Sequence, residues 1–121
     1  MNKNLLIIDD NKHIRDLISL YLKDDFQIFT APDGEKGLKI FFEKKIDIVI
    51  SDMIMPLVDG IEVIQKIKNK NPSIPILAIS GGGVKEGDDY LPLAKGFGVD
   101  SILHKPFTRK ELISSIKQIN R

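Results

Sequence analysis

The sequence alternates between short apolar runs and longer amphipathic stretches, and this alternation limits the folds open to the chain. The first apolar run is NLLIID at residues 4–9. The stretch after it places apolar side chains at Ile14, Leu17, Ile18, Tyr21 and Leu22, which is the spacing of one helix face. Strands that alternate with helices are typical of an α/β fold, because parallel strands need a helical crossover between them.

The same alternation continues to the end of the sequence. It predicts strands at residues 26–31, 47–51, 76–80 and 101–104, and helices at residues 32–45, 60–70 and 88–95. A last helix is expected to begin at Thr108, where Glu111 completes a capping-box pattern. A length of 121 residues is too short for an eight-fold barrel. We therefore predict one domain with a doubly wound, five-stranded parallel sheet in strand order 2-1-3-4-5, a flavodoxin-like (βα)5 fold.

Composition excludes several function classes. A net charge of +1 with no basic stripe argues against a nucleic-acid binder, and the absence of cysteine excludes disulfides and thiolate metal sites. No apolar run approaches the ~18 residues that a membrane span needs, so we expect no membrane insertion. The absence of cysteine fits the cytoplasmic protein that we expect. The last predicted helix ends the sequence, so we expect no output domain.

Polar residues interrupt the apolar runs where the predicted strands end. These residues are Asp9, Asp10, Asp52, Ser80 and Lys105. In a doubly wound sheet the carboxyl ends of the strands share one edge, and ligands bind at that edge. We therefore expect three carboxylates, a hydroxyl and an ammonium to converge there, with Asp52 facing solvent.

Adjacent carboxylates need compensation. Two like charges about 4 Å apart repel by roughly 4 kcal/mol at an effective dielectric near 20. Mg²⁺ would balance Asp9 and Asp10, since it prefers oxygen ligands and often binds carboxylates together with a phosphate. A carboxylate beside such an ion can attack a phosphoryl group, Lys105 can neutralise the phosphate, and the Ser80 hydroxyl can donate to it. Each of these residues taken alone has a simpler explanation, because Asp often caps helices and Lys is usually solvated.

Four segments together resemble the receiver domain of two-component response regulators. They are LLIIDDN, SDMIMPLVDGIEVI, ILAIS and LHKPF, and the CheY-like resemblance covers essentially residues 1–121. It implies that Asp52 is the phosphoacceptor and a Mg²⁺ ligand, that Asp10 binds the ion directly, and that Asp9 binds it through water. It also implies a further ligand, the backbone carbonyl of Ile54.

The resemblance assigns roles near the last strand too. Ser80 would be the switch hydroxyl, Lys105 would pair with the phosphate, and the Lys105–Pro106 bond would be cis. One residue departs from the family pattern: Ile102 stands where members usually carry an aromatic residue. That ring moves inward during signalling, so Ile102 leaves the phosphorylation chemistry unchanged but puts the usual route of signalling in question.

The function expected from the resemblance is a stand-alone phosphorylation switch in a phosphorelay. A histidine kinase or histidine phosphotransfer protein would phosphorylate Asp52, and the altered surface would bind an unidentified downstream protein. The protein would be a monomer or a weak, phosphorylation-dependent dimer, and no enzyme beyond its own phosphorylation and dephosphorylation.

Three alternatives stay open at this point. One is a phosphate-independent interaction domain; the complete set of site residues argues against it, but Ile102 keeps it open. A small phosphatase with an Asp nucleophile is weaker, because Ile54 stands where such enzymes carry a second Asp. A flavin-binding module is weaker still, because DDNKH at residues 9–13 would repel a phosphate.

Overall fold

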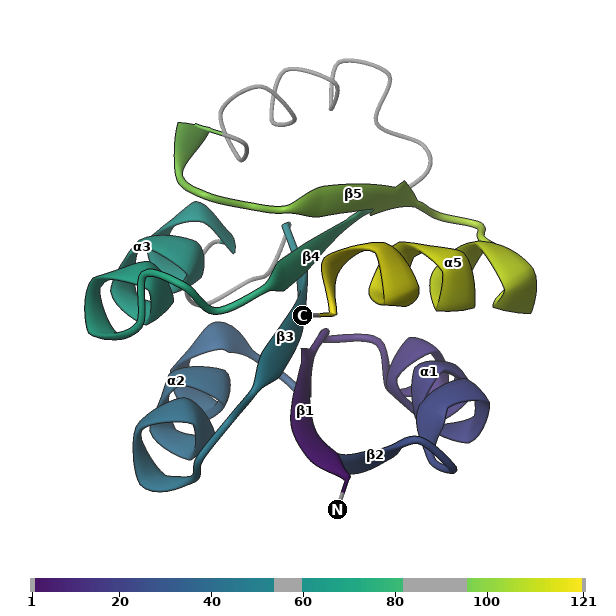
Figure 1. Cartoon of the computed structure of the whole chain (residues 1–121), viewed down its shortest axis with the longest axis horizontal. Coiled ribbons are helices and arrows are strands. Elements are labelled where there is room, and N and C mark those ends of the chain that lie inside the picture. Colours follow the sequence, from purple (N-terminus) through teal and green to yellow (C-terminus); the bar gives the residue numbers. More distant parts are fainter. Residues whose placement is uncertain (1, 54–59, 82–95, 121) are drawn as a thin grey trace.

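The computed structural model describes residues 2–53, 60–81 and 96–120 and contains one five-stranded sheet with helices on both faces (Figure 1). The strands are β1 (Lys3–Ile8), β2 (Phe26–Ala31), β3 (Ile48–Asp52), β4 (Ile76–Ser80) and β5 (Ser101–His104). The described helices are α1 (Lys12–Leu22), α2 (Gly34–Glu43), α3 (Gly60–Lys70) and α5 (Arg109–Ile119). All neighbouring strands pair in parallel in the order β2-β1-β3-β4-β5, which confirms the predicted fold. The helix expected at residues 88–95 lies outside the described residues.

Side chains that precede α1, α2 and α5 cap the first turns of these helices. The Asn11 side chain accepts from the backbone N–H of His13 at 2.9 Å, and Asp33 accepts from the N–H of Lys36 at 2.8 Å. The predicted capping box is present at α5, where Thr108 and Glu111 exchange hydrogen bonds of 2.8 and 3.1 Å. These bonds satisfy N–H groups that a helix cannot pair internally, so they help to determine where these three helices begin.

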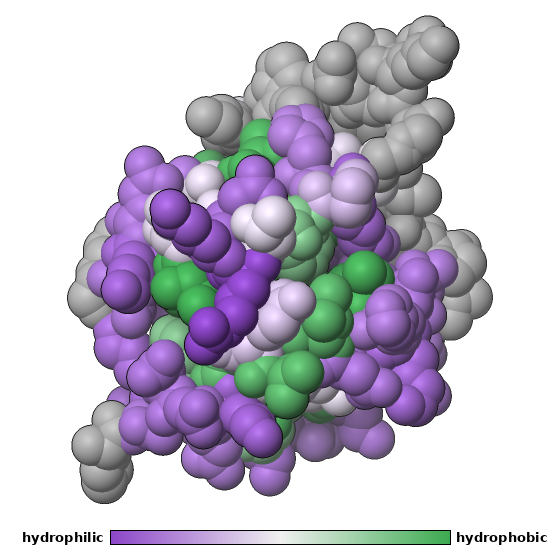
Figure 2. All heavy atoms as spheres, turned by 90° about the vertical axis from the view of Figure 1, so that its right-hand side faces the viewer, coloured by the Kyte–Doolittle hydropathy of each residue, from purple (hydrophilic) through white to green (hydrophobic). Residues whose placement is uncertain are grey.

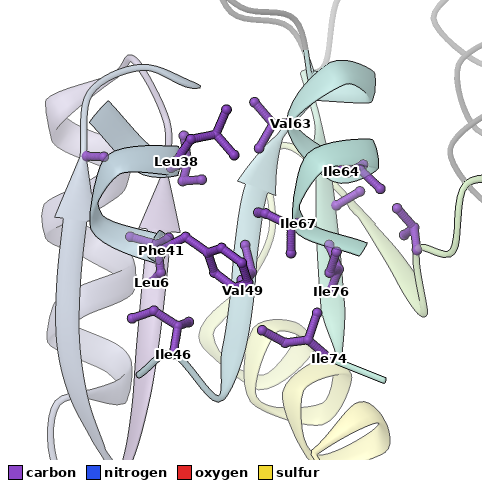
Figure 3. Packing of buried hydrophobic residues seen from close by; sticks show 14 of the residues in the cluster. Leu6, Leu38, Phe41, Ile46, Val49, Val63, Ile64, Ile67, Ile74 and Ile76 are labelled. Atoms are coloured by element: carbon purple, nitrogen blue, oxygen red, sulfur yellow. The ribbon is translucent and has the colours of Figure 1, made fainter. Parts of the chain in front are cut away.

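The core consists of two apolar layers, one on each side of the sheet. On one side, α2 and α3 pack Leu38, Phe41 and Ile67 against strand residues such as Val49 (Figure 3). On the other side, α1 and α5 cover the opposite faces of the same strands. Leu5–Ile8 of β1 are all fully buried. Burial on both faces explains why this strand is a continuous apolar run, and each such side chain contributes about 1.5–3 kcal/mol.

The face formed by α1 and α5 is mainly hydrophilic, with apolar atoms showing between polar ridges (Figure 2). A groove of about 370 Å³ lies along α5 and is lined by Leu22, Asp25, Phe26, Ile113, Ile116, Lys117 and Asn120. Among the described helices, none has the length and apolar character that crossing a membrane requires.

Candidate functional site

Three carboxylates gather at the carboxyl edge of the two central strands. Asp9 and Asp10 follow β1 directly, and Asp52 is the last residue of β3. These strands are neighbours, with Ile8 paired to Ser51. One carboxylate oxygen from each Asp lies within 4.8 Å of the other two. The structure therefore brings the three carboxylates together as the sequence predicts.

Asp9 is fully buried, and hydrogen bonds fix its position. Its N–H donates to the Ala31 carbonyl at 3.1 Å, and its Oδ1 accepts from the Asn11 N–H at 2.8 Å. Its backbone carbonyl accepts from Nη1 of Arg15 at 2.8 Å. The second carboxylate oxygen, Oδ2, is buried without a hydrogen bond among the described residues. Asp9 thus presents one anionic oxygen toward the site, where its near partner is the Lys105 ammonium at 3.0 Å.

The prediction that Asp52 faces solvent is wrong. Only 6% of its side chain is exposed. The Lys105 ammonium lies against its carboxylate, and α3 packs closely on its backbone. The Gly60 N–H donates to the Met53 carbonyl at 3.2 Å. A Cβ atom at Gly60 would lie 2.6 Å from Met53 Cα and 2.8 Å from the Asp52 carbonyl oxygen. Asp10, in contrast, is exposed, so the cluster has a buried side and an open side.

Lys105 joins the two buried carboxylates. Its Nζ lies 3.0 Å from Asp9 Oδ2 and 3.4 Å from Asp52 Oδ2, and 17% of its side chain is exposed. Both contacts are ion pairs, and the contact with Asp52 is also a hydrogen bond. Burial alone would lower the pKa of Lys105, but attraction to Asp52 and Asp9 outweighs burial and raises that pKa.

Ser80 lies next to Lys105 at the same edge. It is the last residue of β4 and is 7% exposed, and its backbone carbonyl accepts from the Lys105 N–H at 2.8 Å. The Lys105–Pro106 peptide bond is cis, as the resemblance implies. Ile102 pairs with Ala78 and packs, half-buried, against the core layer of α2 and α3. The expected carbonyl ligand Ile54 lies outside the described residues.

The chemistry of this cluster suits a hard divalent cation. Three carboxylates against one ammonium leave a negative surplus, because Lys105 is shared between Asp9 and Asp52. Mg²⁺ prefers such oxygen ligands and retains several waters, for which the exposed Asp10 side leaves access. Asp9, Asp10 and Asp52 are the described residues that can hold the ion.

Sequence reasoning missed three residues that shape the site: Asn11, Arg15 and Gly60. Asn11 carries a recognisable signal, because Asn before a helix is a preferred cap. Gly60 follows Asp59 in a turn-like pair, but nothing in that pair reveals the close approach to β3. Arg15 has no sequence signal, because its partner is a backbone carbonyl.

Comparison with known proteins identifies the family of the chain. The model of the response regulator receiver domain matches residues 5–117. The alkaline phosphatase synthesis transcriptional regulatory protein PhoP of Bacillus subtilis is 34% identical over 122 residues, which cover 100% of this chain and 50% of that protein. Response regulator GtcR of Aneurinibacillus migulanus is 31% identical, over 97% of this chain and 47% of its own length. The chain thus spans about half the length of these curated relatives.

Solved structures show the same fold. A response regulator receiver domain protein of Clostridium thermocellum superposes with a TM-score of 0.87 at 32% identity, over 97% of this chain and 93% of that one. A chemotaxis response regulator of Vibrio cholerae gives a TM-score of 0.88 at 25% identity, over 98% of this chain and 99% of that one. The sheet order, the carboxylate cluster and these matches agree, and the chain belongs to the family of response regulator receiver domains of two-component systems.

Proposed function

We propose that this protein is a switch in which Asp52 accepts a phosphoryl group from a phosphohistidine. The donor would be a histidine kinase or a histidine phosphotransfer protein, the partners that a receiver domain implies. The observation that carries the proposal is the buried Asp52 carboxylate, which shares Lys105 with Asp9 at the ligand-binding edge of the sheet. A merely structural ion pair would not require the third, exposed carboxylate of Asp10 beside it.

The proposed reaction is an in-line displacement at phosphorus. A carboxylate oxygen of Asp52 forms the new P–O bond while the P–N bond to the donor histidine breaks. The electron pair of that bond goes to the imidazole nitrogen, which takes a proton from water. The product is an acyl phosphate on Asp52, and attack by water on phosphorus later releases phosphate and regenerates the carboxylate. The residues of this chain contribute positioning and charge stabilisation.

Mg²⁺ belongs to the proposal because of the negative surplus at the site. When bound, the ion would neutralise charge on the phosphoryl oxygens. Asp10 and Asp52 would hold it directly and Asp9 would hold it through water. The family resemblance adds the backbone carbonyl of Ile54.

Phosphorylation would redistribute the contacts of Lys105. In the unmodified protein its ammonium lies between Asp9 and Asp52. A phosphoryl group on Asp52 offers it a more strongly charged partner, and the Ser80 hydroxyl would donate to the same group. Because Lys105 bonds to Ser80 through the backbone, β4 and β5 would respond together. This biases an equilibrium between two surface states, of which one binds the downstream protein.

The signalling surface would differ from the usual one at β5. Ile102 packs against the α2 and α3 layer and has no ring to reorient. We therefore propose that the output depends on Lys105 and Ser80 rather than on a rotating aromatic residue. The remaining parts of the proposal are a cytoplasmic location, a monomer or weak phosphorylation-dependent dimer, and no binding of nucleic acid.

The test is phosphorylation of the purified protein with acetyl phosphate, followed by intact-mass spectrometry and peptide mapping. We expect one phosphoryl group on Asp52 with Mg²⁺ present, none with EDTA, and none in Asp52→Asn. Asp16→Asn is the matched control, because it removes an exposed carboxylate on α1 away from the cluster. Modification of another residue, or equal modification in EDTA, would contradict the proposal. Absence of modification in every protein would favour the phosphate-independent interaction domain.

A further inference from the structure

The side chain of Arg15 crosses from α1 to the end of β1. Its Nη1 donates to the backbone carbonyl of Asp9 at 2.8 Å, and the residue is half-buried. Pairing of β1 with both neighbouring strands ends at Ile8, so this carbonyl has left the sheet ladder. The guanidinium thus satisfies a carbonyl that the sheet no longer pairs.

The bond from Arg15 completes the anchoring of Asp9. The N–H of Asp9 is bonded to β2, and its Oδ1 accepts from the Asn11 N–H. Only Oδ2 is left to face the site. Asp10 follows directly and, within the described part of the chain, makes no side-chain hydrogen bond or ion pair of its own. The place of the Asp10 carboxylate therefore depends on the backbone that Arg15 helps to hold.

We infer that Arg15 is a positioning residue for the divalent cation: through the Asp9 carbonyl it holds the backbone that aims the carboxylates of Asp9 and Asp10. This inference rests on the proposed function, since the ion belongs to that proposal. Residues that orient ligands without touching the metal typically change metal affinity by about 10- to 100-fold when they are mutated. Here Arg15 acts on the main chain between two ligands rather than on a ligand side chain.

A positioning role and a purely electrostatic role of Arg15 predict opposite changes in Mg²⁺ affinity when the residue is replaced. Its guanidinium is a positive charge near the site, and its removal would by itself tighten the binding of Mg²⁺. Loss of the anchor would instead let Asp10 move and would weaken binding. The sign of the change in affinity therefore distinguishes a positioning residue from a distant charge.

The experiment is a calorimetric titration of the full chain with magnesium chloride. It compares the parent with Arg15→Gln, Arg15→Lys and Lys12→Gln. Lys12 is the matched control, because it lies on the same helix, is 77% exposed and pairs with Asp16 rather than Asp9. We expect Arg15→Gln to bind Mg²⁺ about tenfold more weakly. Arg15→Lys, which keeps a charged donor, should recover part of that loss. Lys12→Gln should bind as tightly as the parent or more tightly.

Thermal unfolding of the same proteins separates positioning from general stability. If Arg15→Gln binds Mg²⁺ as tightly as the parent, or more tightly, the inference is overturned. A fall in melting temperature alone would then show that Arg15 contributes only to stability. If Arg15→Gln does not fold, Arg15→Lys decides, and parental affinity in that variant overturns the inference. A parent protein that does not bind Mg²⁺ would overturn the metal part of the proposed function, and this inference with it.

Discussion

At the scale of single residues, the site depends on how Lys105 is shared. Its ammonium is largely buried between two carboxylates that are themselves less than a tenth exposed. Buried charges of this kind need partners, and removal of one partner leaves the others uncompensated. Lys105 therefore stabilises the unphosphorylated protein in addition to its proposed role at the phosphoryl group.

Replacement of Lys105 by Met should lower the free energy of unfolding by about 2–4 kcal/mol in EDTA, because Asp9 and Asp52 lose their counter-ion. The pKa of Lys105 is raised in the folded state, so its contribution is fully present below the ordinary value of 10.5. The contribution is lost as the pH rises through the raised pKa. Urea unfolding of both proteins from neutral to strongly alkaline pH measures the difference. A difference that stays constant throughout would show that the ammonium charge is not responsible.

Neutralisation of Asp9 should mainly lower stability, whereas neutralisation of Asp10 should mainly lower the affinity for Mg²⁺. In Asp9→Asn, the oxygen must keep accepting from the Asn11 N–H, so the new NH₂ group faces the Lys105 ammonium. We expect that variant to lose about 1–3 kcal/mol of stability, because two donors meet in a buried place. Because Asp10 is exposed, the Asp10→Asn variant should keep the stability of the parent. It should bind Mg²⁺ more weakly than the Asp9→Asn variant does. Urea unfolding and metal titration of both variants test this, and the reverse order in either measurement contradicts it.

At the scale of elements, the sequence predicts some boundaries and misses others for physical reasons. β2, β4, β5 and α3 have the predicted bounds, because turn residues or polar residues flank each of them. β1 begins one residue earlier than expected, since Lys3 pairs with Phe26, and the pairing of Asp52 with Ile79 extends β3. Pairing depends on the neighbouring strand, which local composition does not reveal.

Some features of the candidate site could also be predicted from the sequence, and others could not. The convergence of Asp9, Asp10 and Asp52 followed from strand order alone, because parallel strands end at one edge. The burial of Asp52 and the reach of Arg15 did not, since both depend on how α1 and α3 pack against the sheet.

The contact of α3 with β3 gives a prediction for Gly60. Replacement by Ala should displace the backbone of Asp52 and Met53, because the added Cβ has no room there. Overpacking of this kind costs about 1–3 kcal/mol. We also expect slower phosphorylation of Asp52. Gly96→Ala is the control, since a Cβ there meets nothing within 4 Å. Melting temperatures and phosphorylation rates that are the same for both variants would contradict the close packing.

At the scale of the whole molecule, two apolar layers support a site that carries repelling charges. The layers pack on opposite faces of one sheet (Figure 1), and the carboxylates lie where β1 and β3 end. The apolar layers thus stabilise the fold away from the site. A bound cation would stabilise the site itself, because it would reduce the repulsion between the carboxylates.

Removal of the divalent cation should therefore lower the stability of the whole protein. At a Mg²⁺ concentration 100 times the dissociation constant, binding to the folded state alone adds about 2.7 kcal/mol. We expect a higher melting temperature in Mg²⁺ than in EDTA for the parent. The difference should largely disappear in Asp10→Asn. Calorimetric scans in both buffers give the comparison, and equal melting temperatures for the parent would argue against a cation site.

The hydrogen bond between Lys3 and Asn120 has a consequence for the connectivity of the chain. The Lys3 ammonium donates to Asn120 Oδ1 at 3.0 Å, so the start of β1 and the end of α5 meet at the edge of the sheet opposite the carboxylates. A short linker could join these two ends and close the chain into a ring. New ends could then be opened in the exposed segment Asn71–Ser73, at that same edge. Such a circular permutant would keep every strand pairing and every carboxylate in place, because the site depends on the order of strands in space rather than in sequence.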